Sequence, residues 1–120
     1  MIERKREEAE IVEGIITCLT LKGYIVLRVN QWRADKAGGD VVPDLIVTHP
    51  KWGEGEAILA EVKTEQGKLS KRRPSHRTEL GYSQQDLFDM GRMFVWRNLY
   101  QAEADIVRYE RRRNMERKDA

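Results

Sequence analysis

The sequence lacks the marks of a secreted or membrane-bound protein. Among its 120 residues Cys18 is the one cysteine, so no disulfide can form within the chain. It contains no run of about 18 apolar residues, so we expect no membrane-spanning helix. The segment Met1–Glu10 is charged throughout, unlike the apolar core of a secretory signal. These absences predict a cytoplasmic protein in a reducing environment, in which Cys18 is a small buried hydrophobic residue.

A strong net charge is also lacking, because 22 Lys and Arg residues offset 20 Asp and Glu residues to leave +2. The charges are nevertheless unevenly distributed. Residues 63–77 contain six basic and one acidic side chain, and residues 108–118 contain six basic and two acidic ones. Such clusters are typical of a surface that binds a polyanion such as nucleic acid. A solvated loop and a solvated helix face would explain them as well, so charge alone does not identify the partner.

The length predicts one domain, residues 1–120, with one hydrophobic core. Apolar residues spaced three or four apart predict helices, and stretches rich in β-branched and aromatic residues predict strands. The predicted order is a helix over 2–22, strands over 24–30, 43–47 and 57–63, a short helix over 83–91, a strand over 92–97 and a closing helix over 99–114. This order predicts an α/β fold in which helices flank a mixed four-stranded sheet.

Three charged residues stand in segments that otherwise favour burial. Asp44 opens the second predicted strand, and Glu61 and Lys63 interrupt the third. Because side chains alternate along a strand, Glu61 and Lys63 project from the same face. If these two strands pair through the loop between them, Asp44 lies at the same end of the sheet. Two carboxylates and one amine would then converge on one point.

This combination suits cleavage of a phosphodiester bond. Carboxylates are hard oxygen ligands for Mg²⁺ or Mn²⁺, and the carbonyl of Val62 offers another oxygen. A bound ion polarises the phosphate, and Lys63 can orient the attacking water and stabilise the developing charge. A surface Glu–Lys pair on an edge strand, with Asp44 in a turn, explains the bare pattern equally simply. The surrounding residues are therefore needed to decide.

Further motifs are spread over nearly the whole chain; together with the core they are Glu8-Ala9-Glu10-Ile11, Gly23-Tyr24, Arg28-Val29-Asn30, Pro43-Asp44, Glu61-Val62-Lys63, Gly67-Lys68-Leu69-Ser70 and Val95-Trp96-Arg97. This set of motifs resembles the VRR-NUC (virus-type replication-repair nuclease) branch of the PD-(D/E)XK nucleases.

The resemblance implies a restriction-endonuclease-like core. It implies that Asp44 and Glu61 are metal ligands, that Lys63 is the catalytic lysine and that Glu8 is a supporting acid, although a solvated glutamate explains Glu8 as well. Free-standing members, often from phages, resemble dimeric nucleases that resolve four-way (Holliday) DNA junctions. For this chain the resemblance therefore implies Mg²⁺ or Mn²⁺ as cofactor, branched DNA as substrate and a homodimer.

The chain departs from the family pattern at one position. A glutamine usually follows the Lys-Leu-Ser turn, and here Arg73 stands at that spacing. Gln84 and Gln85 come later, and either is a candidate for the missing role. Gln84 shares a helical face with Leu87 and faces the sheet, whereas Gln85 leans towards Asp89 and solvent.

The segment between the third strand and the short helix is long, polar and basic, which is typical of functional loops. Its cations follow the catalytic strand directly, so we expect them to contact the DNA backbone; they are Lys68, Lys71, Arg72, Arg73 and Arg77. Some aromatic residues near loops could stack on unpaired bases or anchor the loops to the domain; they are Trp32, Trp52 and Tyr82. His49 and His76 are expected at the surface. The sequence thus predicts a metal-dependent, structure-selective endodeoxyribonuclease, with a non-catalytic nucleic-acid-binding module as the alternative.

Overall fold

The computed structural model describes residues 2–29, 43–71 and 82–119. The elements follow the predicted order of helix, three strands, helix, strand and helix. They are α1 (Ile2–Leu21), β1 (Ile25–Arg28), β2 (Leu45–Thr48), β3 (Ile58–Val62), α3 (Gln84–Asp89), β4 (Phe94–Trp96) and α4 (Leu99–Asp119).

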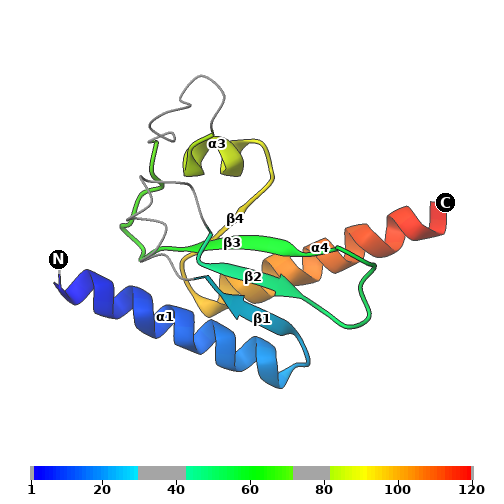
Figure 1. Ribbon diagram of the computed structural model, residues 1–120, viewed down its shortest axis with the longest axis horizontal. Helices are drawn as coiled ribbons and strands as arrows, with labels where there is room; N and C mark the ends of the chain where they lie inside the picture. The colour runs from blue at the N-terminus through cyan, green and yellow to red at the C-terminus, as the bar shows by residue number, and fades with distance from the viewer. Residues whose placement is uncertain (1, 30–42, 72–81, 120) are drawn as a thin grey trace.

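The four strands form one mixed sheet in the order β1-β2-β3-β4 (Figure 1). β2 pairs antiparallel with β1 and with β3, and β4 pairs parallel with β3. The predicted α/β fold with a mixed four-stranded sheet flanked by helices is therefore confirmed. The arrangement is compatible with a restriction-endonuclease-like core.

The hydrophobic core lies between the sheet and the two long helices. Ile15 and Leu19 of α1 and Ala102 and Ile106 of α4 are buried against alternate residues of the strands, among them Trp96. In Figure 1, α4 passes behind the sheet and α1 runs along its β1 side. Because both helices use the same face, the opposite face is left for α3 and for whatever the protein binds.

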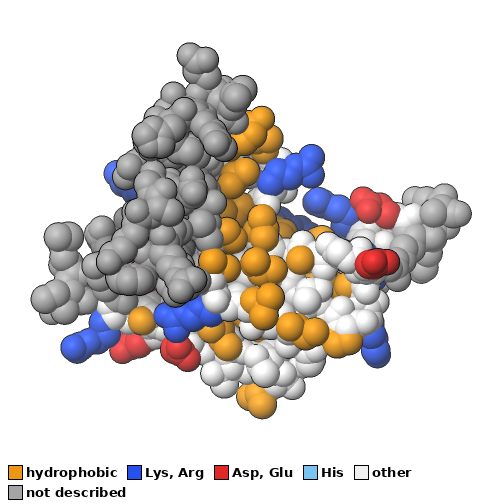
Figure 2. Space-filling view, in the orientation of Figure 1, with side chains coloured by type: hydrophobic (Ala, Val, Ile, Leu, Met, Phe, Trp, Pro, Cys, Tyr) orange, Lys and Arg blue, Asp and Glu red, His pale blue; other side chains and the backbone are white. Residues whose placement is uncertain are grey.

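The middle of that opposite face is apolar across β1 to β3. The register places Leu27 beside Ile46 and Ile46 beside Leu59, so the three side chains form a row across the strands. Leu27 remains 55% exposed. Figure 2 shows hydrophobic side chains gathered over the middle of the visible face, with Lys and Arg side chains at its borders.

The two ends of the sheet differ in composition. At one end, called here the connecting-loop end, the chain passes from β2 to β3 through residues 49–57. Trp52 is 8% exposed and packs against Tyr109, their ring centroids 5.0 Å apart. The interpretation of Trp52 as a loop anchor is therefore confirmed. His49 was expected on the surface, but it is half-buried with its ring 4.9 Å from that of Tyr24. Trp32 and His76 lie outside the described residues.

Several boundaries differ from those expected. α4 continues to Asp119 instead of ending near Asn114, because residues 115–118 are all good helix formers. Cys18 is half-buried, not fully buried, and its thiol contacts the Glu103 carboxylate at 3.5 Å. Within the described segments, no helix is both long enough and apolar enough to cross a membrane.

Candidate active site

The end of the sheet opposite the connecting loop, called here the site end, holds the residues predicted to carry the chemistry. Asp44 precedes β2, and its Oδ2 accepts a hydrogen bond of 2.7 Å from the backbone N–H of Val62. Leu45 pairs with Ala60, so the next position in this antiparallel register sets Asp44 opposite Glu61. The predicted pairing of the two strands is confirmed, and it brings the Asp44 carboxylate to the peptide that joins Glu61 to Val62.

Glu61 lies in β3 and is only 2% exposed. A buried carboxylate is costly unless hydrogen bonds compensate for its lost hydration. Gln84 supplies one such bond, since its Nε2 donates to Glu61 Oε2 at 2.7 Å. The other end of the same amide, Gln84 Oε1, accepts from the backbone N–H of Ser70 at 3.0 Å. One glutamine therefore ties the candidate catalytic strand to the basic segment that follows it.

The two candidate glutamines have different positions. Gln84 reaches Glu61, whereas Gln85 Nε2 donates to Asp89 Oδ1 at 2.9 Å on the exposed side of α3. Ser83 fixes this orientation, because its side chain accepts from Asp86 N at 3.1 Å and caps α3. The structure thus brings Gln84 to Glu61, whereas the side chain of Gln85, the other predicted candidate, bonds to Asp89 instead.

Lys63 follows directly after β3. Its backbone N–H donates to the carbonyl of Trp96 at 3.1 Å, which extends the pairing of β3 with β4. Lys63 is half-buried, and alternation along the strand sets it on the same face as Glu61. Asp44, Glu61 and Lys63 thus occupy neighbouring positions at one end of the sheet; that their side chains meet around one cation stays a prediction.

Arg97, the arginine of the Val95-Trp96-Arg97 motif, holds the turn that follows Lys63, a role that the sequence did not assign to it. Its Nη1 lies 2.5 Å from the carbonyl oxygen of Thr64 and 2.6 Å from that of Gly67. Gly67 closes the turn by donating its N–H to Thr64 O at 3.1 Å, and a Cβ there would lie 3.3 Å from the Lys63 Cβ. Arg97 stands beside Lys63 in the parallel register of β3 and β4, and that register is the signal from which its contact could have been inferred.

Asp44 and Glu61 offer carboxylate oxygens, the kind of ligand that a hard divalent cation prefers. Mg²⁺ is commonly held by one or two carboxylates, with waters completing its coordination. Among the described residues, no three His, Cys, Asp or Glu side chains are grouped closely enough to hold a metal by themselves. Glu8 is half-buried on α1. Its supporting role, like that of the Val62 carbonyl, stays a prediction.

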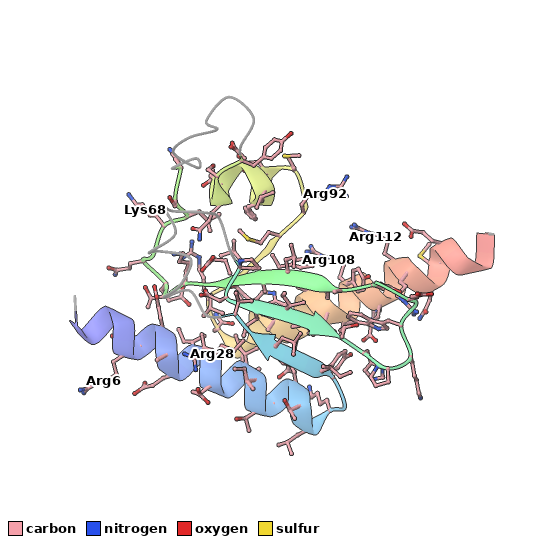
Figure 3. The ribbon with its side chains drawn as sticks, viewed as in Figure 1. Arg6, Arg28, Lys68, Arg92, Arg108 and Arg112 are labelled. Atoms are coloured by element: carbon pink, nitrogen blue, oxygen red, sulfur yellow. The ribbon has the colours of Figure 1, made fainter. Side chains whose placement is uncertain are left out.

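The basic side chains lie in two places. Lys68 and Lys71 are exposed on the segment between β3 and α3, where Figure 3 labels Lys68. Arg72, Arg73 and Arg77 lie outside the described residues. On α4, Arg108 pairs with Asp105 at 2.9 Å and Arg113 Nε lies 2.5 Å from Glu56 Oε2. Two of the basic side chains of α4 are therefore paired with acidic residues of the same chain, whereas Lys68 and Lys71 are exposed beside the site.

Comparison with models of protein families, with curated proteins and with solved structures found no match. The function is therefore argued from the residues of the site and their geometry.

Proposed function

We propose that this protein is a metal-dependent, structure-selective endodeoxyribonuclease that hydrolyses phosphodiester bonds of branched DNA such as four-way junctions. The observation that carries the proposal is the position of the Asp44 carboxylate, hydrogen-bonded at 2.7 Å to the peptide that follows Glu61. Two carboxylates from adjacent strands, with a lysine directly after β3 on the same face as Glu61, suit metal-assisted hydrolysis of a phosphodiester bond.

Each residue has a separate task in this proposal. Asp44 and Glu61 hold Mg²⁺ or Mn²⁺. When bound, the ion supplies Lewis-acid activation of the scissile phosphate. Lys63 orients the attacking water and stabilises the negative charge that develops on the phosphate. Gln84 holds the Glu61 carboxylate in place through the hydrogen bond of 2.7 Å. Glu8 is the further acid that the family resemblance adds.

Lys68 and Lys71 would contact phosphates on one side of the cut. Both follow the catalytic strand within ten residues and are exposed. A junction with two-fold symmetry needs paired cuts, so we propose that the protein acts as a homodimer. Sedimentation of the purified protein with and without a four-way junction tests this part separately.

The decisive experiment is a cleavage assay with Asp44→Asn and Lys63→Ala. The amide introduced by Asp44→Asn keeps an oxygen that can accept the bond from Val62 N but loses the negative charge, so the fold is preserved while metal binding is weakened. The substrates are labelled four-way, flap, duplex and single-stranded DNA in Mg²⁺ and in Mn²⁺. Glu54→Gln, at an exposed carboxylate on the connecting loop, is the matched control.

We expect both site variants to lose cleavage and the control to keep it. Undiminished cleavage of the four-way junction by either site variant would contradict the proposed mechanism. Salt-sensitive DNA binding by the wild type, without cleavage in either metal, would instead assign the chain to the non-catalytic nucleic-acid-binding modules.

A further inference from the structure

A groove of about 700 Å³ lies beside the candidate active site, within the size range of small-molecule sites. Its wall includes Val95 of β4, the register neighbour of Glu61 in β3. Parallel neighbours in a sheet are about 5 Å apart, so the groove begins next to the position of Glu61. The candidate active site and the groove therefore share one surface of the molecule.

The floor and the rim of the groove have different chemistry. Leu69, Phe88 and Val95 provide apolar surface, and Phe88 is an aromatic residue that is 43% exposed. Lys68 and Lys71 add two exposed ammonium groups on one side. An apolar, aromatic surface beside cations complements a nucleotide, which has a flat base and a charged phosphate.

The groove is also held in a fixed position relative to Glu61. Its Lys68–Lys71 wall is joined to Gln84 through the bond of 3.0 Å from Ser70 N, and Gln84 is joined to Glu61. A second connection joins Ser70 O to Gln85 N at 3.0 Å. A group bound between this wall and Phe88 would therefore be held in a fixed position relative to Glu61.

We infer that this groove binds one unpaired nucleotide next to the bond that is cut, with its base against Phe88 and its phosphate on Lys68 and Lys71. The inference rests on the proposed nuclease function and narrows its substrate. A base paired within a duplex cannot enter the groove, whereas a base at a branch point or at a junction of single and double strand can. The groove thus selects DNA in which a strand leaves the helix.

The test measures binding without cleavage. The probe is a short single-stranded oligonucleotide with one 2-aminopurine, whose fluorescence is quenched on stacking, titrated in Ca²⁺ or EDTA. Phe88→Leu removes the ring but keeps apolar volume, and we expect it to raise the Kd about tenfold, in line with the loss of one stacked base. Phe88→Tyr keeps a ring and should restore binding. Tyr100→Leu, which removes an 81% exposed aromatic outside the groove, should have no effect.

A second probe distinguishes the contribution of the base to binding from that of the phosphates. An oligonucleotide with an abasic residue in place of 2-aminopurine keeps the same phosphates, so weaker binding of this strand is expected. Equal affinity for the two strands, or equal affinity of Phe88→Leu and Tyr100→Leu for the 2-aminopurine strand, overturns the groove assignment. Either result leaves the nuclease proposal intact, because the Asp44→Asn and Lys63→Ala assays decide it independently. Conversely, normal quenching by a protein that never cleaves DNA would support nucleotide binding in the groove and contradict the nuclease proposal.

Discussion

The two ends of the sheet each contain a glutamate with restricted exposure, but they surround it differently. At the connecting-loop end, Glu56 contacts Arg113 and accepts hydrogen bonds from Tyr109 and from the Gly53 N–H. At the site end, one of the interactions of Glu61 is the hydrogen bond that it accepts from the amide of Gln84. The first arrangement joins the connecting loop to α4, and the second joins the sheet to an exposed basic segment. Under the proposed function, a carboxylate thus stabilises the fold at one end and takes part in the chemistry at the other.

The largest expected effect comes from removing the charge at the site end. Glu61→Gln keeps the shape of the side chain and an oxygen that can accept from Gln84, so the fold should be retained. We expect cleavage of a four-way junction to fall by at least about 10³-fold, the scale of losing a group that stabilises the transition state. Single-turnover rates and thermal unfolding are measured on the same preparation. A variant that folds normally and cleaves at the wild-type rate would show that Glu61 has only a structural role.

The next largest effect lies at the connecting-loop end. Trp52 is 8% exposed, packs on Tyr109 and donates from Nε1 to Glu110 Oε2 at 3.3 Å. Trp52→Ala would leave a cavity, and we expect it to lower the free energy of unfolding by about 3–4 kcal/mol. Urea denaturation measures this change. Tyr100→Ala, at an 81% exposed position, is the control and should change stability little.

A smaller loss of stability is expected for Glu56→Gln. Burial raises the pKa of Glu56, but the contact with Arg113 and the bonds from Tyr109 and Gly53 outweigh it and lower the pKa from 4.5 to about 2. We expect the variant to lose about 2 kcal/mol of stability at neutral pH, typical of a hydrogen-bonded charge. Cleavage per folded molecule should be unchanged.

The same pKa predicts how the effect depends on pH. Because the folded state binds the proton less tightly than the unfolded state, the stabilisation by Glu56 is complete above about pH 4.5. It is lost as the pH falls towards about 2. The difference in unfolding free energy between wild type and Glu56→Gln should therefore shrink over this interval. A constant difference would contradict the assigned role, and Glu54→Gln on the same loop is the control.

The features that could be predicted from the sequence are those set by local patterns of residues. The order of the elements follows from local patterns, such as the apolar spacing of α1 and the β-branched residues of β2. The choice of Gln84 over Gln85 follows from helix periodicity, because residues on the side of Leu87 face the sheet. Trp52 was recognisable as a loop anchor, because a large aromatic side chain in a short loop tends to pack on the neighbouring part of its own domain. Its ring packs on Tyr109.

Other features depend on contacts between distant segments. Arg97 reaches Thr64 and Gly67, a contact that requires the parallel register of β3 and β4. The contact of the half-buried His49 with Tyr24 similarly requires Tyr24, which precedes β1, to lie beside the connecting loop. Neither is encoded in local spacing. The groove beside Glu61 has the same origin, because its residues come from four separate stretches of the chain.

The smallest expected effect is that of Arg97→Lys at the site end. A lysine keeps the charge but cannot hold the carbonyls of Thr64 and Gly67 with one planar group, so the turn after Lys63 should loosen. We expect junction cleavage to fall about tenfold, the order of loss when a group supporting the site is changed. Hydrogen exchange of the Gly67 N–H should become faster, and Arg92→Lys, at an exposed position before β4, should change neither property. Wild-type exchange at Gly67 in Arg97→Lys would show that the guanidinium does not hold this turn, and the contrast between the two ends would then rest on Glu61 and Gln84 alone.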